Sequence, residues 1–173
     1  MDGLFTNTQA DRSPRKSVEW YTPAWIFEEL GIDFDLDPSS PHDAETAVPA
    51  EVKYTVFDDG LSKPWFGRVW LNPPYGRDTP QWIRRMVDHG CGIALVFSRT
   101  DAAWFQEAMT ACAAILFMKG RVQFTPGREN QHKRSRCGAG TAMLAFGQGC
   151  ADALQKMSSR GTYIDRRTNG IAP

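Results

Sequence analysis

The chain contains a short apolar run that leads directly into two prolines, Val69-Trp70-Leu71-Asn72-Pro73-Pro74-Tyr75-Gly76. Residues 69–71 have the composition of a buried strand, and the prolines end it because they cannot donate backbone hydrogen bonds to a neighbouring strand. Proline also restricts the preceding residue to extended backbone, so the loop is stiff. In α/β proteins, loops at the carboxyl ends of strands carry the functional groups. We therefore expect a functional site at residues 72–75.

This loop presents hydrogen-bond acceptors beside an aromatic ring. The side-chain oxygen of Asn72 and the backbone oxygen of Pro73 suit a planar group that carries an NH2, and Tyr75 can stack on its ring. Accepting both N–H bonds directs the nitrogen lone pair toward an electrophile, which is preorganised electrostatic catalysis. A Pro-Pro pair alone indicates only a turn between a strand and a helix. Its position between Asn72 and Tyr75, after a strand, favours catalysis.

Five further segments have strand character, through apolar and acidic alternation in the first and nearly continuous apolar runs in the last three. They are residues 32–38, 53–57, 92–97, 111–118 and 140–146. Helical patterns separate several of these strands, which predicts an α/β fold with an open, mostly parallel sheet. Lys119-Gly120-Arg121 predicts a tight turn into residues 122–124, and hence a late antiparallel hairpin.

The first helix is expected just after two aromatic residues. Thr22 is a good N-cap, Pro23 suits the first helical position, and Gly31 ends the helix. Free N–H groups at a helix N-terminus suit a carboxylate, and Trp20 and Tyr21 suit a cation. By themselves these residues equally describe a capped helix with a hydrophobic anchor.

Two more helices follow the Asn-Pro-Pro-Tyr segment. Asp78 or Thr79 caps the first of them, and Gly90 ends it. Asp101 is expected to cap the second. Arg99, at the end of the strand before that helix, can hold a phosphate or a nucleotide, or can pair with Asp101.

Composition limits the class of protein. The chain has 173 residues, 42% of them hydrophobic, which predicts one domain with a real core. No apolar run has the length of a membrane span, and no signal peptide is evident at the N-terminus. The four cysteines are scattered without a C-x-x-C pair, so neither a zinc site nor any other metal site is expected, and a reducing cytoplasm is the expected location.

Charge is unevenly distributed although the net charge is zero. Residues 28–59 contain ten acids and one base, whereas residues 111–173 contain ten bases and three acids. This asymmetry suggests two ligands of opposite charge, although such runs are often solvated faces. We expect a mobile arm at residues 1–19, a catalytic domain at residues 20–148, and a short helix and basic tail at residues 149–173.

Several motifs match one family in the order in which that family has them. They are Trp20-Tyr21-Thr22-Pro23, Asp59-Gly60-Leu61 with Trp65, the run 68–76, Arg99-Thr100-Asp101 with Trp104 and Phe105, and Gly120-Arg121-x-x-Phe124. The chain resembles the phage-type DNA N6-adenine methyltransferases, which use S-adenosylmethionine, and the similarity extends from residue 20 to residue 146. The resemblance implies a Rossmann-like methyltransferase fold in a protein of the bacterial host cytoplasm that acts on double-stranded DNA.

The resemblance also implies roles for individual residues. The catalytic residues would be Asn72, Pro73, Pro74 and Tyr75. The cofactor contacts would be Trp20, Tyr21, Thr22, Pro23, Asp37, Pro38, Asp59 and Leu61, with Asp59 on the adenine amino group and Leu61 as a wall. The DNA contacts would be Arg99, Arg128, Lys133, Arg134 and Arg136.

Two of these cofactor contacts have alternatives. Asp35 competes with Asp37, because a shift of one residue along a strand exchanges its faces. Asp59-Gly60 is also an ordinary turn pair. The first strand leads into Ser39-Ser40-Pro41 without a glycine-rich turn, which departs from the general methyltransferase pattern but agrees with the phage-type group.

The implied reaction is direct transfer of a methyl group to adenine N6 of a flipped-out base, with no covalent intermediate. The alternatives are a cytosine-N4 or protein-glutamine methyltransferase, and a non-catalytic DNA-binding module on the same fold. Protection of phage DNA from restriction is the role that the resemblance suggests. The sequence specifies neither the recognition site nor whether the protein is a monomer or a dimer.

Overall fold

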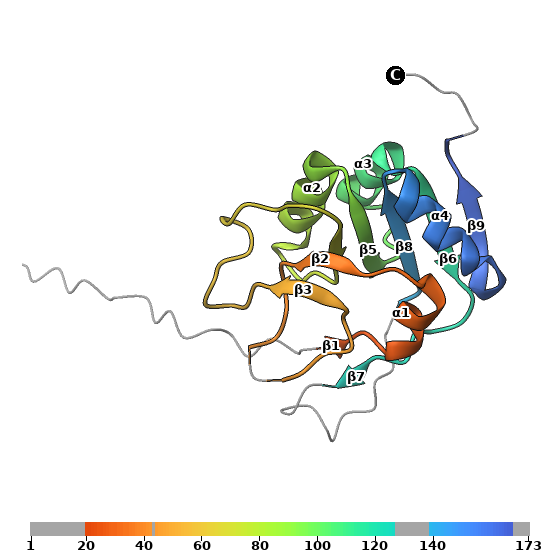
Figure 1. The fold of residues 1–173 in the computed structure, drawn as a ribbon. Helices are drawn as coiled ribbons and strands as arrows, with labels where there is room; N and C mark the ends of the chain where they lie inside the picture. Colours follow the sequence, from red (N-terminus) through yellow and green to blue (C-terminus); the bar gives the residue numbers. More distant parts are fainter. Residues whose placement is uncertain (1–19, 43, 127–138, 168–173) are drawn as a thin grey trace, which may run out of the picture.

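The computed structural model describes residues 20–42, 44–126 and 139–167. They form a seven-stranded sheet in the order β3-β2-β4-β5-β8-β6-β9 (Figure 1). Its strands are β2 Phe34–Asp37, β3 Ala50–Lys53, β4 Val69–Leu71, β5 Gly92–Phe97, β6 Ala114–Met118, β8 Thr141–Phe146 and β9 Gly161–Asp165. The fold is therefore α/β, as predicted.

The sheet has a parallel half and an antiparallel half. Strands β3, β2, β4 and β5 pair in parallel. Strand β8 is antiparallel to both of its neighbours, β5 and β6, and β9 is antiparallel to β6. The sheet is thus mixed, with less parallel pairing than the sequence predicted.

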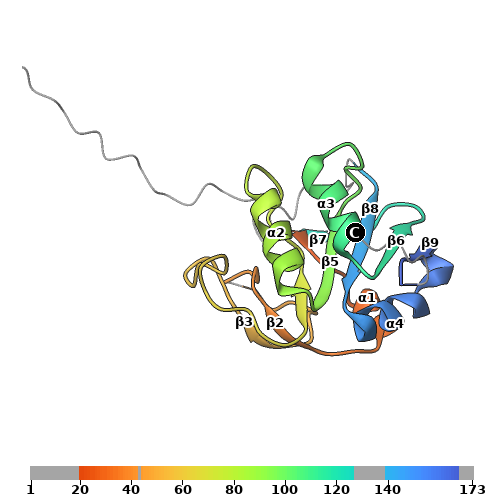
Figure 2. The ribbon, with the colours of Figure 1, turned by 90° about the horizontal axis from the view of Figure 1, so that it is seen from above.

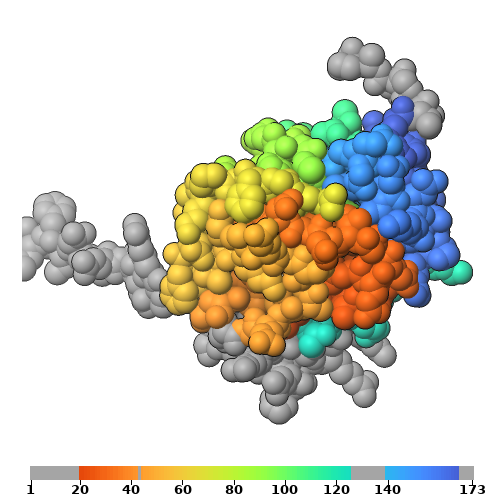
Figure 3. All heavy atoms as spheres, viewed as in Figure 1, coloured from red at the N-terminus to blue at the C-terminus, as the bar shows by residue number. Residues whose placement is uncertain are grey.

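Helices cover both faces of the sheet. They are α1 Ala24–Leu30, α2 Thr79–His89, α3 Ala103–Ala111 and α4 Gln148–Lys156, followed by the 3-10 turn η2 Ser158–Arg160. Helices α2 and α3 pack on one face, and α1 and α4 on the other (Figure 2). In Figure 3, α1 and α4 lie side by side on the face toward the viewer. None of the helices in the described ranges combines the length and apolar character that a membrane crossing requires.

The two helical layers explain the apolar runs in the sequence. Alternate residues of β5 and β8 enter opposite cores: Ile93, Leu95, Met143 and Ala145 face α1 and α4, whereas Ala94, Val96, Ala142 and Leu144 face α2 and α3. All eight are fully buried. Strands covered on both faces need apolar side chains at every position, so the prediction that residues 92–97 are buried on both faces is confirmed.

The expected late hairpin is wrong in detail. Residues 121–124 form no strand, and β7 (Thr125–Pro126) does not return along β6. Instead β7 pairs antiparallel with β1 (Trp20–Tyr21), next to α1 (Figure 1). The strand that does reverse beside β6 is β8, the last apolar run of the sequence.

Four other expectations concern element ends, and three of them are wrong. The strand expected at residues 53–57 is β3, Ala50–Lys53, and residues 54–57 lie in the loop after it. The segment expected as a strand from residue 111 begins only at Ala114, because α3 extends to Ala111. Ala102, not Asp101, is the N-cap of α3. The helix ends at Gly31 and Gly90 are confirmed, and both glycines are left-handed.

The segment expected as a short helix and basic tail, residues 149–173, begins with α4 and continues into a strand of the sheet. Helix α4 completes the core beside α1, and β9 forms the edge strand of the sheet. Arg167 is held between two carboxylates, with its guanidinium 2.6 Å from both Asp152 and Asp165. Residues up to 167 therefore belong to the folded domain, while the arm expected at residues 1–19 lies outside the described residues.

Candidate active site

The chain reverses its direction of winding between β2 and β4. From β2 it passes to β3 on one side and then returns to β4 on the other. At such a switch point, the loops after the two strands separate and leave a crevice for ligands at their carboxyl ends. At this switch point the hydroxyl of Ser39, after β2, donates to the backbone oxygen of Asn72, after β4, at 2.9 Å. The Asn-Pro-Pro-Tyr loop therefore lies where the topology predicts a site.

The Asn72 side chain is fixed at both ends. Its Nδ2 donates to the backbone oxygen of Trp20 at 2.9 Å, and its Oδ1 accepts from the Tyr75 hydroxyl at 3.2 Å. The first bond ties β1 to the end of β4. It also orients the amide so that the oxygen points away from Trp20. Pro73 is buried, and no hydrogen bond to its backbone oxygen forms within the described part of the chain.

Tyr75 lies over the end of β5. Its ring stacks on Phe97 with centroids 3.8 Å apart and planes inclined by 18°. Its hydroxyl also lies 3.3 Å from the backbone oxygen of Leu95. The sequence predicted that Tyr75 stacks on a substrate ring, and Phe97 was not identified as its partner.

Thr79 anchors the other end of this loop. Its hydroxyl donates to the Pro74 oxygen at 3.0 Å and accepts from the Gly76 N–H at 2.9 Å. The N-cap of α2 is Asp78, whose side chain makes no capping bond. Of the two residues expected to cap α2, Thr79 thus stabilises the Asn-Pro-Pro-Tyr loop, and Asp78 is the N-cap by position.

The carboxylates of β2 have different environments. Asp37 is 4% exposed, and its Oδ1 accepts from the Ser39 N–H at 3.1 Å. Burial raises the pKa of Asp37 to about 6, against the lowering effects of the Ser39 N–H and of Lys53. Asp35 instead accepts from the Arg68 N–H at 2.5 Å and thereby joins β2 to the segment before β4. Of the two, Asp37 is the buried carboxylate at the carboxyl end of β2.

The turn at residues 59–61 packs against the end of β2. Gly60 is buried, and a Cβ there would collide with the Pro38 carbonyl oxygen. Asp59 is exposed, has φ +52°, and accepts from the Ser62 hydroxyl at 2.5 Å. Leu61 is partly buried against the α2 side of the core. The structure thus brings Asp59 and Leu61 beside Asp37 and Pro38.

Asp58, which the sequence analysis passed over, stabilises this loop. It accepts from the Thr55 N–H at 2.9 Å and pairs with Lys63 at 2.6 Å. The Lys63 ammonium lowers the pKa of Asp58 to about 2. These bonds close the loop that carries Asp59.

The segment before α1 differs from its expected capping geometry. Pro23 is the N-cap, α1 begins at Ala24, and Thr22 makes no capping bond. Thr22 is 4% exposed, and its hydroxyl has no hydrogen-bond partner among the described residues. Such buried, unpaired hydroxyls are rare in folded proteins and point to a missing partner. The expected N-cap role of Thr22 is therefore wrong.

The predicted DNA contacts are mostly outside the described residues, where Arg128, Lys133, Arg134 and Arg136 all lie. Arg99 is exposed just after β5, at the same edge of the sheet as Asn72. Within the described ranges, no ion pair joins Arg99 to Asp101. That alternative for Arg99 is therefore wrong.

Thr141 is a further polar residue at this edge that the sequence analysis missed. It is the first residue of β8, directly opposite Phe97 of β5. It is 1% exposed, and its hydroxyl bonds to nothing in the part of the chain that the structure describes. The available signal was a single hydroxyl in an otherwise apolar strand.

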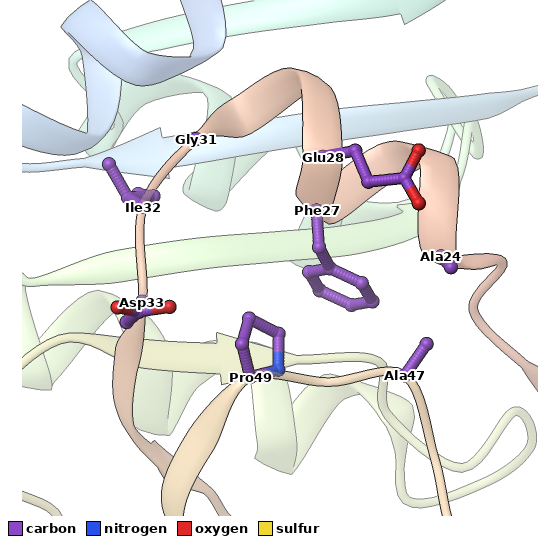
Figure 4. A pocket seen from close by; sticks show the side chains of 8 residues that line it. All are labelled: Ala24, Phe27, Glu28, Gly31, Ile32, Asp33, Ala47 and Pro49. Carbon is purple, nitrogen blue, oxygen red and sulfur yellow. The ribbon is translucent and has the colours of Figure 1, made fainter.

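One hollow lies away from these residues. It has a volume of about 440 Å³ and lies between α1 and the segment before β3 (Figure 4). Its lining consists of Ala24, Phe27, Glu28, Gly31, Ile32, Asp33, Ala47 and Pro49. None of the predicted catalytic or cofactor residues lines it, and Asp33 precedes β2 whereas the crevice follows it. Across the described segments, no three His, Cys, Asp or Glu side chains are grouped as a metal site requires.

Comparison with known proteins gives one match. The family model described as DNA N-6-adenine-methyltransferase (Dam) matches residues 9–167, which is most of the chain. No curated protein and no solved structure matches. The family match agrees with an amide oxygen and a backbone oxygen held at the end of β4. The chain belongs to the DNA N-6-adenine-methyltransferase (Dam) family and is a DNA methyltransferase specific for adenine N6.

Proposed function

We propose that this protein transfers the methyl group of S-adenosylmethionine to N6 of an adenine that is flipped out of double-stranded DNA. The orientation of the Asn72 amide is the observation that carries the proposal. Its nitrogen is bound to Trp20, so its oxygen remains as an acceptor for a substrate amino group. The Pro73 backbone oxygen, which no backbone N–H of the described residues bonds, is the second acceptor.

The two acceptors account for the chemistry at the amino group. Hydrogen bonds from both N–H groups to Asn72 Oδ1 and to Pro73 hold the nitrogen with its lone pair directed out of the ring plane. This electrostatic arrangement exists before the base arrives, because Pro73 and Pro74 restrict the backbone. The proton leaves the nitrogen after methyl transfer, so the site needs no strong base. The base must leave the duplex to reach this recessed loop.

The residues around the crevice fit S-adenosylmethionine, which supplies an electrophilic methyl carbon on a sulfonium. The unpaired, buried Thr22 hydroxyl fits the polar methionine end, beside Trp20, Tyr21 and Pro23. The Asp37 carboxylate can accept from ribose hydroxyls, with Pro38 beside it. The Asp59 carboxylate can accept a hydrogen bond from the adenine amino group of the cofactor, and Leu61 can pack against the adenine ring. The β2–β4 switch point supports a Rossmann-like methyltransferase arrangement for this cofactor.

DNA contacts are proposed for the basic residues near this edge. Arg99 is exposed and free of the pairing with Asp101. Arg128, Lys133, Arg134 and Arg136 fall in one basic stretch of the sequence. Cationic side chains supply most of the sequence-independent affinity for DNA, so methylation of DNA by this protein is expected to weaken as salt increases.

The decisive experiment is incubation of unmethylated DNA with the protein and S-adenosylmethionine, followed by digestion to nucleosides and mass spectrometry. We expect N6-methyladenine. Detection of N4-methylcytosine would be consistent with the same mechanism acting on cytosine in place of adenine. An unmodified DNA product, with cofactor binding intact by calorimetry, would refute the DNA substrate.

The variant Asn72→Ala tests the catalytic loop itself. It removes one acceptor, and we expect activity to fall by at least about 100-fold, the usual effect of removing one preorganised hydrogen-bonding group. Gln148→Ala is the matched control, since it removes an exposed carboxamide at the opposite end of the sheet. Full activity of Asn72→Ala in a folded protein would contradict the proposed mechanism.

A further inference from the structure

Tyr75 contacts both the Asn72 amide and the Phe97 ring. Its hydroxyl, which has one proton to donate, lies 3.2 Å from Asn72 Oδ1 and 3.3 Å from the Leu95 backbone oxygen. Asn72 Oδ1 is the acceptor for the target amino group in the proposed reaction. The Tyr75 ring lies flat on Phe97 at 3.8 Å. The target amino group and the Tyr75 hydroxyl therefore compete for the same oxygen.

The phenol resembles the group that displaces it. Both a phenol and the aminopyrimidine half of adenine are flat six-membered rings with an N–H or O–H donor on one edge. A base whose amino group reaches Asn72 Oδ1 along the same direction would place its ring over Phe97, as Tyr75 does now. The stacking partner of Tyr75 thus marks a surface for the base.

Thr141 adds a hydrogen-bonding group to this surface. Phe97 and Thr141 are directly opposite in the register of the paired strands β5 and β8. Directly opposite residues share a face of the sheet, with Cβ atoms about 5 Å apart. The Thr141 hydroxyl is buried and has no partner among the described residues. An unpaired hydroxyl is unfavourable in the free protein, and a ligand with a ring nitrogen at this place would satisfy it.

We propose that Phe97 and Thr141 form the inner wall of the slot for the target base, and that Tyr75 fills this slot until the base displaces it. This inference rests on the proposed function. Phe97 stacks on the inner face of the base, and the Thr141 hydroxyl donates to a ring nitrogen on its edge. Tyr75, once it leaves Phe97, covers the outer face. The slot selects a flat ring that carries both an amino donor and a nitrogen acceptor.

Kinetics with unmethylated plasmid DNA test the role of Phe97. Stacking of a base on an aromatic side chain strengthens nucleic-acid binding by about 5- to 150-fold per base. We therefore expect Phe97→Leu to lower kcat/KM for DNA by a factor within that range. Phe97→Tyr retains the aromatic face and should restore kcat/KM to within about threefold of the wild type. The affinity for S-adenosylmethionine, measured by calorimetry, should be unchanged in both. Equal kcat/KM for the leucine variant and the wild type would overturn the role of Phe97.

Thr141 offers a sharper test, because activity and stability should change in opposite directions. Thr141→Val keeps the shape and removes the unpaired hydroxyl, so we expect a higher midpoint of urea unfolding and a kcat/KM for DNA at least fivefold lower. Thr141→Ser keeps the hydroxyl and should keep kcat/KM. A kcat/KM in Thr141→Val equal to that of the wild type would show that the Thr141 hydroxyl does not contact the base.

The wild-type reaction separates this inference from the proposed function. If the wild-type protein makes no N6-methyladenine, the proposed function fails and the slot fails with it. If the wild type makes N6-methyladenine while Phe97→Leu and Thr141→Val do so with unchanged kcat/KM, only the slot is refuted. A loss of kcat/KM in both variants, with rescue by Phe97→Tyr and Thr141→Ser, supports it.

Discussion

Replacement of Asp37 by Asn should stabilise the free protein, and the gain should grow as the pH rises. Asp37 is 4% exposed at the end of β2, and burial raises its pKa from 3.8 to about 6. Asn keeps an oxygen that can accept the Ser39 N–H and carries no charge. The variant thus removes the ionisation and retains the hydrogen bond.

The sign and size follow from proton linkage. Between pH 4 and pH 6 the unfolded chain loses the Asp37 proton while the folded protein still holds it, so folding stability falls as the pH rises. With pKa values of 3.8 unfolded and about 6 folded, the penalty is about 1 kcal/mol at pH 4.5 and about 3 kcal/mol at pH 7.5. Asp37→Asn should therefore gain about 2 kcal/mol more at pH 7.5 than at pH 4.5.

Urea unfolding of both proteins at pH 4.5, 5.5, 6.5 and 7.5 measures this difference directly. Other titrating groups are common to the two proteins and cancel. Asp101→Asn, at an exposed position, is measured in parallel as the control for removal of a surface carboxylate. A gain for Asp37→Asn that is independent of pH would refute the argument that a buried charge is responsible. If Asp37 also contacts the cofactor, the same variant should bind S-adenosylmethionine more weakly.

Two further predictions concern packing and thiol reactivity. Gly60→Ala should destabilise the protein by roughly 1–3 kcal/mol and weaken cofactor binding, because the new Cβ would collide with the Pro38 carbonyl. Gly149→Ala, which places a Cβ in open space in α4, is the control. Equal midpoints of urea unfolding for the two variants would contradict the prediction. In a Cys137→Ser background, the exposed Cys91 should react with a thiol reagent in the native protein. Cys112 and Cys150 should react only on unfolding, since burial raises their pKa values to about 12 and about 11; rapid labelling of a second thiol would refute this.

Features that depend on neighbouring residues in the sequence were predictable. The strand before Asn72 ends where Pro73 removes the backbone donor, and Gly31 and Gly90 end their helices in the left-handed conformation. The apolar run of residues 92–97 forms β5 because helices cover both faces of the sheet there. In each case the local chemistry leaves few alternatives.

Features that depend on partners distant in the sequence could not be predicted. Residues 161–165 carry no strong strand pattern, and they form β9 because the edge of β6 is available to them. Residues 125–126 pair with β1 rather than with the nearby β6, a choice that no local turn signal contains. The expected hairpin failed for this reason.

The same distinction applies to the site. Asn72 and Tyr75 were identified because the motif is contiguous, whereas Ser39 bonds Asn72 from the loop after β2 and Thr141 lies opposite Phe97 through strand pairing. Thr79 was identified only as a candidate helix cap, although its hydroxyl bonds the loop on both sides. Supporting groups of this kind become visible only when the tertiary contacts are known.

A single carboxamide joins the two halves of the proposed reaction. The Nδ2 of Asn72 binds the backbone of Trp20, in the segment proposed to hold the cofactor, and its Oδ1 is the acceptor proposed for the base. A shift of Trp20 on cofactor binding would therefore rotate or release the amide that receives the base. Tyr75 holds the same oxygen in the free protein, so the acceptor is paired rather than exposed to competing donors before DNA arrives. The bond that Asn72 Nδ2 donates to the Trp20 backbone oxygen predicts that Asn72→Asp loses this contact, because a carboxylate has no N–H to donate there.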